Sequence, residues 1–590
     1  MMRTCRPWLA CLLLILVAGV AWARQETKAA APAIGGTPGR SPGSKPGGKP
    51  AGKPEEAAGF GESVTVNVVN VDVFVTDKKS GNRVTGLGKK DFELYEDGKP
   101  MAITNFYAVE GGKLAAVSGE PPAVAPAGAA PGPQLDRLPV PEDQKLRLVV
   151  YIDNFNLRPF HRNKVMRALR VFLDQKLRRD DQAMLITYDR SLHVRHGFTS
   201  DSSLINSEML ALEKISAQGV HQDSDRRETL RNIDESKSAA EAEAYARAYA
   251  GSAFNDLQFT IDALKDVVTM LAGMPGRKAV VYVSDGLPMI AGQDIYYAIQ
   301  NKYREQSTSL TQTMEFDGSR RFEELAATAN ANRVTFYTID AAGLRVFSST
   351  TAENRGTGAG TDVYVDSIEM SNLQSPLQML AEKTGGVAIL NTNEVGPRLD
   401  RIAQDFSSFY SLGYSPPHSG DGRLHRLQVK VKHKGWEVRV REGYRDKSPE
   451  SRMNDSTLAA LHFPFESNPL GISLEFGRAT PRDDGYFVVP VNVRIPLGKL
   501  VLVPGEKTHD ARVRLFIAAM DSDGGESEVQ QTPVPIKIPA ADAGKIGGKS
   551  FVYTVSLLMR SGDQKVAIGL RDDVAAQESF VTGGLRVQAR

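Results

Sequence analysis

The sequence predicts an α/β protein flanked by two all-β regions, and three patterns carry this prediction. Near-continuous apolar runs such as LVVYI and AVVYV alternate with helical periodicity in the middle of the chain, which is typical of a parallel sheet covered by helices. On either side, apolar residues alternate at period 2, as in antiparallel strands with one solvated face. At 590 residues the chain is too long for one hydrophobic core, so we expect several domains.

The first 23 residues have the three parts of a signal peptide. Arg3 and Arg6 supply a positive start, an apolar run covers 8–20, and Ala21-Trp22-Ala23 is a small-x-small cleavage site. The run is shorter than the about 20 residues of a membrane span. We therefore predict an exported protein, periplasmic or extracellular, with no transmembrane span in the mature chain. An uncleaved amphipathic anchor is the alternative.

Composition excludes several functional classes. Both cysteines, Cys5 and Cys11, lie in the signal peptide, so the mature chain should have no disulfide and no cysteine nucleophile. The formal net charge of +2 gives no reason to expect nucleic acid as the partner. The metalloprotease, nucleotide-binding and nucleophile-elbow motifs are absent, and the nine histidines are dispersed along the sequence, which predicts no compact histidine cluster.

Two stretches of biased composition separate the predicted domains. Residues 24–60 are rich in Pro, Gly and Lys and should form a disordered linker, because they cannot bury enough apolar surface to offset their ordering entropy. A Pro/Ala-rich segment at 111–143 is interpreted as a second linker. Between them, 61–110 alternates strictly in VTVNVVNVDVFVTD and has a turn at Asp97-Gly98, which predicts a small antiparallel β module.

Residues 144–447 are predicted to form the α/β domain, with a highly charged helical insertion at 216–251. The Ser/Thr/Gly-rich stretch from Phe347 to Ser371 is interpreted as a loop. After Tyr414 helical periodicity stops, and RLQVKVK with WEVRVRE predicts a terminal β-hairpin at the edge of the α/β sheet. From 455 to 590, alternating runs separated by Gly, Asp and Pro turns predict a β-sandwich.

Acidic and amide side chains follow the first strand of the α/β region. KLRLVVYIDNFN ends on Asp153, Asn154 and Asn156, and KAVVYVSDG delivers Asp285 to the end of a second strand. Ligands of open α/β sheets bind beyond the carboxyl ends of the strands. These four residues are therefore the predicted partner-binding surface, and Asp153, Asp285 and Asn156 are candidate metal ligands.

Several segments together resemble the von Willebrand factor A-type fold, and more narrowly the exported acidobacterial-type proteins related to it. The resemblance spans roughly Val64 to Tyr444 and does not reach the C-terminal sandwich. It is carried by the following segments in order: VTGLGKKDFELYEDGKP, PGRKAVVYVSDGLP, VTFYTIDAAGL, LQMLAEKTGGVAILNTNE, FYSLGYSPP and GWEVRVREGY. The resemblance implies a Rossmann-like domain that binds another macromolecule.

The resemblance also implies a metal-ion-dependent adhesion site with an Asp-x-Ser-x-Ser loop, a threonine and a second aspartate. Asp153 and Asp285 match the two aspartates, whereas Phe155 and Leu157 stand where the serines belong and offer no oxygen. The threonine has no clear counterpart. A hard cation such as Mg²⁺ needs about six oxygens, so we interpret the site as degenerate. We predict that the protein requires no cofactor, and Mg²⁺ or another divalent cation is the candidate ion for this site.

These observations predict a non-catalytic, adhesion-type binding protein whose partner is a protein or another macromolecule of the cell envelope. Two alternatives stay open. One is a metal-dependent hydrolase that uses the acids at the strand ends, and the other is a purely structural envelope spacer.

Overall fold

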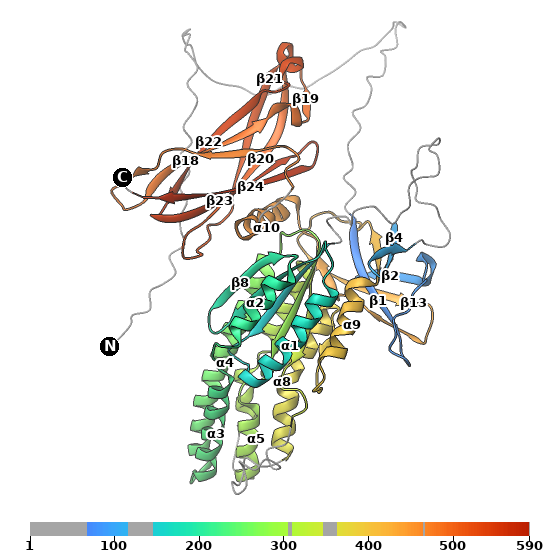
Figure 1. The fold of residues 1–590 in the computed structure, drawn as a ribbon, viewed down its shortest axis with the longest axis vertical. Helices are drawn as coiled ribbons and strands as arrows, with labels where there is room; N and C mark the ends of the chain where they lie inside the picture. The colour runs from blue at the N-terminus through green and yellow to red at the C-terminus, as the bar shows by residue number, and fades with distance from the viewer. Residues whose placement is uncertain (1–67, 116–144, 305–308, 346–362, 464–466, 589–590) are drawn as a thin grey trace, which may run out of the picture.

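The computed structural model describes residues 68–115, 145–304, 309–345, 363–463 and 467–588. The predicted signal peptide, the 24–60 linker and most of the 111–143 linker lie outside the described residues. Figure 1 shows a central α/β layer, a β module beside it and a second set of sheets at the C-terminal end. None of the described helices combines the length and the hydropathy that a membrane span requires.

A six-stranded sheet lies at the centre of the α/β layer, which confirms the predicted α/β class. Its strand order is β11-β10-β9-β6-β7-β8, with β8 antiparallel to β7 and the other neighbours parallel. Counted within this layer, the order is 3-2-1-4-5-6, as in doubly wound sheets. The strands are β6 (Leu146–Asp153), β7 (Gln182–Tyr188), β8 (Leu192–Thr199), β9 (Arg277–Ser284), β10 (Val334–Asp340) and β11 (Ala388–Ile389).

Helices cover both faces of this sheet because β6 is apolar on both faces. Leu148 and Val150 belong to one core and Val149 and Tyr151 to the other. The first core is closed by α1 (Pro159–Lys176), α2 (Ser202–Leu212) and α9 (Gly396–Ser407), and the second by α4 (Ala239–Met270), α7 (Ser319–Ala331) and α8 (Val363–Thr384).

The charged insertion forms a helical protrusion that extends away from the C-terminal sheets (Figure 1). The insertion at 216–251 forms α3 (Gly219–Glu235) and the first part of α4, and α5 (Gln293–Tyr303) packs against them in a small shared core. The interpretation of Phe347 to Ser371 as a loop is wrong for its last part, because α8 begins at Val363; residues 346–362 lie outside the described residues.

The β module contains strands from both sides of the α/β layer. Its two sheets have the orders β14-β1-β12-β4-β5 and β15-β13-β2-β3. The strands are β1 (Val69–Asp77), β2 (Phe92–Glu96), β3 (Lys99–Met101), β4 (Asn105–Glu110), β5 (Lys113–Ala115), β12 (Phe409–Tyr414), β13 (Leu424–Val431), β14 (Trp436–Arg439) and β15 (Gly443–Arg445). The α/β layer is therefore inserted between the fifth and sixth strands of this module.

This arrangement corrects the prediction of a terminal hairpin at the edge of the α/β sheet, because the described pairings place β13 and β14 in different sheets of the β module. β13 pairs with β2, where Val429 lies opposite Leu94, and β14 pairs with β1. Leu427 and Val429 are buried in the core of the β module. The edges of the α/β sheet are β8 and the two-residue β11, whereas the apolar residues of β1 and β2 form a core that β13 and β14 complete.

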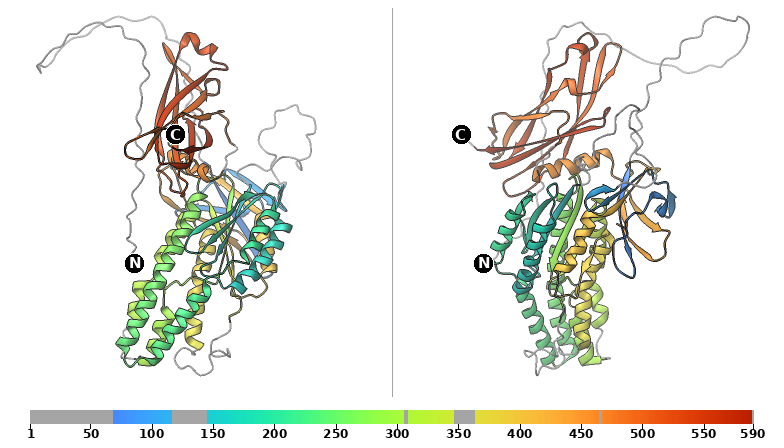
Figure 2. Two further views of the ribbon diagram at one scale, coloured as in Figure 1. Left: turned by 60° about the vertical axis from the view of Figure 1, so that its left-hand side comes forward. Right: turned by 45° about the vertical axis from the view of Figure 1, so that its right-hand side comes forward.

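The C-terminal region begins with a helix that contradicts the prediction that helices stop after Tyr414. Ser448 caps α10 (Pro449–His462), since its Oγ accepts a hydrogen bond from the Ser451 amide, and Pro449 occupies the first turn. α10 lies between the α/β layer and the C-terminal sheets (Figure 2). Met453 and Leu461 of α10 are buried against those sheets, and this packing stabilises the helix.

Two antiparallel sheets follow α10 and enclose one shared core. One sheet contains β16 (Ser473–Phe476), β17 (Thr480–Pro481), β18 (Phe487–Pro496) and β22 (Ser550–Met559). The other contains β19 (Leu502–Pro504), β20 (Thr508–Met520), β21 (Gln530–Pro539), β23 (Gly562–Asp572) and β24 (Gln577–Val587).

Candidate functional site

Asp153 lies at the end of β6, where the sequence predicts it, but its carboxylate is completely buried. Oδ2 accepts hydrogen bonds from the Tyr282 hydroxyl (2.5 Å), the Asn156 side-chain amide (2.8 Å) and Ser284 Oγ (3.2 Å), and Oδ1 accepts one from the Asn156 backbone amide (3.2 Å). Burial raises the pKa of Asp153 to about 6, against the opposing effect of these hydrogen bonds. The protein itself therefore satisfies this carboxylate.

Asp285 follows β9 and anchors the start of α1. Its Oδ2 accepts hydrogen bonds from the Arg158 backbone amide and lies beside His161 Nδ1, each at 2.9 Å. Oδ1 is buried and has no hydrogen-bond partner among the described residues. Sequence reasoning missed His161, because nothing in its local pattern distinguishes it from other helix residues.

The other predicted site residues are turned towards the protein. Asn154 Oδ1 accepts a hydrogen bond from Arg162 (2.6 Å), and Asn156 Oδ1 accepts one from Gln222 (3.1 Å). Phe155 packs edge-on against Tyr188 in the core. Asp153 and Asn154 are therefore too buried to contact a partner directly, whereas Asn156 lines an open cavity and Asp285 is partly exposed.

These residues do not fit the divalent cation that the resemblance implies. Four protein donors already occupy the Asp153 carboxylate, and Phe155 and Leu157 are buried in opposite cores. In the described part of the chain, two groups of three or more histidine and acidic side chains are close enough to share an ion, and neither includes Asp153 or Asp285. No step of the proposed function therefore passes through a metal at this position.

An acidic cavity opens beside Asn156, beyond the carboxyl ends of β6 and β9. It has a volume of about 420 Å³ and lies between α3, α4, α5 and α8. Its walls come largely from the charged insertion. Its charged groups are one guanidinium and six carboxylates: Arg226, Asp223, Asp225, Glu228, Asp256, Asp294 and Glu369.

The single guanidinium in this cavity is neutralised from within. Arg226 Nε lies 2.7 Å from Asp294 Oδ2, and its Nη2 lies 2.9 Å from Glu369 Oε2. Asp225 and Glu228 are exposed on α3 and form no ion pair within the described residues. The cavity therefore keeps a surplus of negative charge that faces solvent.

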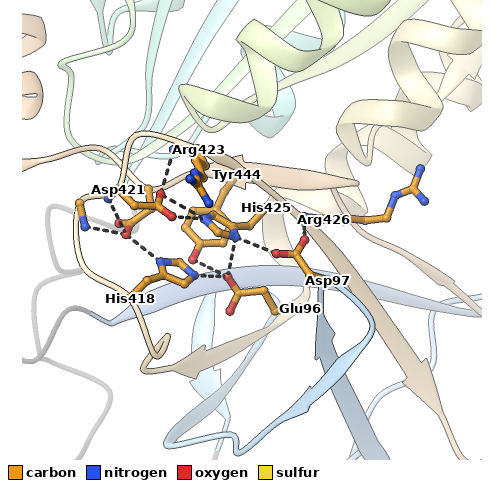
Figure 3. Close-up of polar contacts among 10 residues, drawn as sticks. Glu96, Asp97, His418, Asp421, Arg423, His425, Arg426 and Tyr444 are labelled. Atoms are coloured by element: carbon orange, nitrogen blue, oxygen red, sulfur yellow. Dashed lines mark hydrogen bonds and ion pairs between the residues drawn. The ribbon is translucent and has the colours of Figure 1, made fainter.

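A second cluster of ionisable side chains lies in the β module, which corrects the prediction of no compact histidine cluster (Figure 3). The imidazole rings of His418 and His425 are stacked, with centroids 3.9 Å apart and planes 12° from parallel. Glu96 and Asp97 come from the end of β2 and the turn after it, on one side of the stack.

Each ring nitrogen of the stack faces a carboxylate. His418 Nε2 lies 2.7 Å from Glu96 Oε1, and His425 Nδ1 lies 2.8 Å from Asp97 Oδ2. At the other side, His418 Nδ1 lies 2.9 Å from Asp446 and His425 Nε2 lies 3.2 Å from Asp421.

These carboxylates change the pKa of both histidines. Desolvation lowers both pKa values, but it is outweighed by the hydrogen bonds of Asp446 and Glu96 to His418 and of Asp97 and Asp421 to His425. Each pKa is therefore raised above its usual value. No local sequence signal could have revealed the cluster, because more than 300 residues separate Glu96 from His418.

No protein-family model matches this chain, and no curated protein matches it in sequence. Solved structures similar to it include a manganese-loaded Plasmodium vivax TRAP protein, with 12% identity, a TM-score of 0.22, and coverage of 52% of this chain and 96% of that chain. A von Willebrand factor type A protein from Catenulispora acidiphila has 11% identity and a TM-score of 0.19, covering 75% and 66%.

The pilus adhesin SpaC from Lactobacillus rhamnosus GG, in an open conformation, has 9% identity and a TM-score of 0.24, covering 86% of this chain and 58% of that chain. At such low identities and TM-scores, these likenesses carry no argument about what this chain binds. The geometry of its own residues has to supply that argument.

Proposed function

We propose that this chain is an exported, non-catalytic binding protein built on a von Willebrand A-type layer, and that it engages a cationic protein segment through the acidic cavity. The observation that carries the proposal is the cavity itself. It lies where open α/β sheets bind ligands, beyond the carboxyl ends of β6 and β9, and its volume of about 420 Å³ is within the usual range for binding sites.

The charges of the cavity favour a basic partner. Asp225 and Glu228 are exposed carboxylates without an ion pair among the described residues, whereas Arg226 is held between Asp294 and Glu369. A lysine or arginine side chain entering from solvent meets an excess of negative charge, which both steers the encounter and fixes orientation. Tyr245, half exposed on α4 at the cavity wall, offers an aromatic face for such a cation.

Export and the fold type rest on other observations. Residues 1–23 have the charge, apolar length and cleavage pattern of a signal peptide. The strand order 3-2-1-4-5-6 agrees with the resemblance to the von Willebrand A-type fold. Because the residues around Asp153 do not fit a cation, the proposed binding mode needs no metal at that point, and the partner surface moves from Asp153 to the cavity beside Asn156.

Titration of the full chain with a lysine-rich decapeptide tests this proposal. We expect saturable binding that weakens about tenfold or more in the double variant Asp225→Asn/Glu228→Gln, because the two unpaired carboxylates are lost while the fold is untouched. Isothermal titration calorimetry at two salt concentrations provides the measurement, and affinity should fall as salt rises.

The matched control is Asp523→Asn/Glu528→Gln, which removes one exposed aspartate and one exposed glutamate from the C-terminal sheets. If both double variants weaken peptide binding equally, only net charge matters and the cavity is not the binding site. Loss of a hydrolytic activity on chelation would instead favour the metal-dependent hydrolase, and absence of any peptide binding would favour the structural spacer.

A further inference from the structure

We propose that Glu96, His418 and His425 bind a zinc ion in the β module, at a site independent of the acidic cavity. The three side chains come from β2, from the loop between β12 and β13, and from β13 (Figure 3). Their ligand atoms all lie within 4.8 Å of one another. Two imidazole nitrogens with a carboxylate are a ligand set that zinc prefers.

The distances at the Glu96 side of the histidine stack suit tetrahedral zinc. Glu96 Oε1 lies 2.7 Å from His418 Nε2 and 3.4 Å from His425 Nδ1. In a tetrahedron with bonds of about 2.0–2.1 Å, ligand atoms are about 3.3 Å apart. Small outward shifts therefore admit the ion, and the fourth position faces Asp97, whose Oδ2 lies 2.8 Å from His425 Nδ1.

An unsatisfied atom points independently to a missing ligand. Glu96 is 2% exposed, and its Oε2 is buried without a hydrogen bond of normal geometry among the described residues, although the Tyr414 hydroxyl interacts with the same carboxylate. Its other oxygen, Oε1, lies within reach of three groups at once, namely His418, His425 and the Tyr444 hydroxyl (3.0 Å). A buried carboxylate is costly when its charge is only partly satisfied, and a cation bound to Oε1 lowers the cost by neutralising the Glu96 carboxylate as a whole.

The surroundings of the two histidines also match those of metal ligands. A ligating histidine usually passes its other ring proton to a carboxylate, which fixes the tautomer and strengthens the ligand. His418 Nδ1 faces Asp446 at 2.9 Å, and His425 Nε2 faces Asp421 at 3.2 Å. Both carboxylates lie on the side of the stack away from Glu96, where outer partners belong.

Zinc binding requires one change in the stack. A metal lies close to the plane of each imidazole that ligates it, and two rings 12° from parallel cannot both meet this condition. His418 is in the loop between β12 and β13 and has 21% of its side chain exposed, whereas His425 is held in β13 and has 8% exposed. His418 is therefore the ring that tilts when the ion enters from solvent.

Zinc titration of the chelator-treated full chain, followed by isothermal titration calorimetry, tests the proposal. We expect one ion per chain, no competition from Mg²⁺, and loss of affinity by at least about 100-fold in Glu96→Gln and in His425→Gln. Asp421→Asn removes an exposed outer partner and should weaken binding about tenfold. Co²⁺ substitution adds a spectroscopic readout, since its visible absorption bands report tetrahedral coordination.

His462→Gln is the matched control, because His462 pairs with Glu526 (2.5 Å) without a second histidine, and its zinc affinity should equal that of the wild type. Circular dichroism checks that each variant folds. If Glu96→Gln does not fold, the Asp421→Asn variant still tests the site, because Asp421 is exposed. Zinc binding that survives both ligand substitutions overturns the proposal. The proposal is also overturned if the chain binds no zinc and NMR shows that both imidazoles titrate at a raised pKa. In that case the histidines are held by protonated hydrogen bonds to the carboxylates and not by a metal.

Discussion

Lys278 places an ammonium group inside the protein at the start of β9. Its Nζ donates hydrogen bonds to the carbonyl oxygens of Met274 (3.0 Å) and Ala272 (3.3 Å), and no carboxylate contacts it among the described residues. Burial, with nearby Arg333 and Lys447, lowers the pKa of Lys278 to about 7. The sequence places this residue at a strand start but carries no sign that its charge is buried.

The difference in the free energy of unfolding between the wild type and a Lys278→Met variant should depend on pH. Above pH 7 the folded lysine is largely neutral, whereas the unfolded lysine stays protonated to about pH 10.4, so unfolding takes up a proton. The wild-type free energy of unfolding should therefore rise, relative to the variant, by about 1 kcal/mol per pH unit between about pH 7 and pH 9. Denaturant unfolding at several pH values measures this.

The exposed Lys214→Met is the control, since its curve should run parallel to the wild type. A parallel curve for Lys278→Met as well would contradict the lowered pKa of Lys278.

The contribution of Asp153 to the free energy of unfolding changes with pH in the opposite direction to that of Lys278. Burial raises the pKa of Asp153 to about 6, so between its unfolded value and pH 6 the folded chain binds more protons than the unfolded chain. The contribution of Asp153 to stability is fully present at low pH and is lost as pH rises through 6. Sequence reasoning correctly placed Asp153 at the end of a strand, but its burial depends on Tyr282 and Ser284 of the neighbouring strand.

At the scale of elements, α10 connects the α/β layer to the C-terminal sheets through a close backbone approach. The turn after α4 meets α10 at Gly273, where an added Cβ would overlap the backbone of Asp455 and Ser456. Ser456 Oγ also donates a hydrogen bond to the Gly273 carbonyl (3.1 Å). α10 was not predicted because Met453 and Leu461 face the C-terminal sheets while Ala459 faces the α/β core, which blurs the single stripe of an amphipathic helix.

Gly273→Ala should lower the stability of the chain by about 1–3 kcal/mol, because the methyl group has no space beside α10. Gly251→Ala is the matched control with the opposite sign. Gly251 lies inside α4 with open space around it, so alanine there should stabilise by about 0.5–1 kcal/mol. Thermal unfolding of both variants measures the two shifts, and a Gly273→Ala variant as stable as the wild type would disprove the close contact.

At the scale of the whole molecule, the β module is discontinuous in sequence. β12 pairs with both β1 and β4, and β13 pairs with β2, so strands from residues 409–445 complete sheets begun by residues 69–115. Ion pairs reinforce the junction with the α/β layer: buried Asp405 pairs with Arg83 and Arg439, and Arg277 pairs with Asp72 (3.0 Å).

A chain that ends after Ser408 should lose the β module, because β1, β2 and β4 then lack their central partners. A chain that ends after Lys447 keeps all nine strands of the module. Limited proteolysis with mass spectrometry should show rapid cleavage within 68–115 only in the shorter chain, while the described α/β segments 145–304 and 363–407 stay protected as an internal control. Equal protection of 68–115 in both chains would contradict the discontinuous module.

The α/β class, the strands that contain LVVYI and AVVYV, and the acids at their ends could be predicted from the sequence, because apolar periodicity and turn residues are local properties of the chain. The pairing of strand edges became clear only from the folded chain. Tertiary folding placed β13 and β14 in the two sheets of the β module, buried Asp153, and brought Glu96 to His418 and His425. The physical reason is that contacts between distant segments depend on which strands remain unpaired and which charges remain buried, and neither is encoded by local pattern.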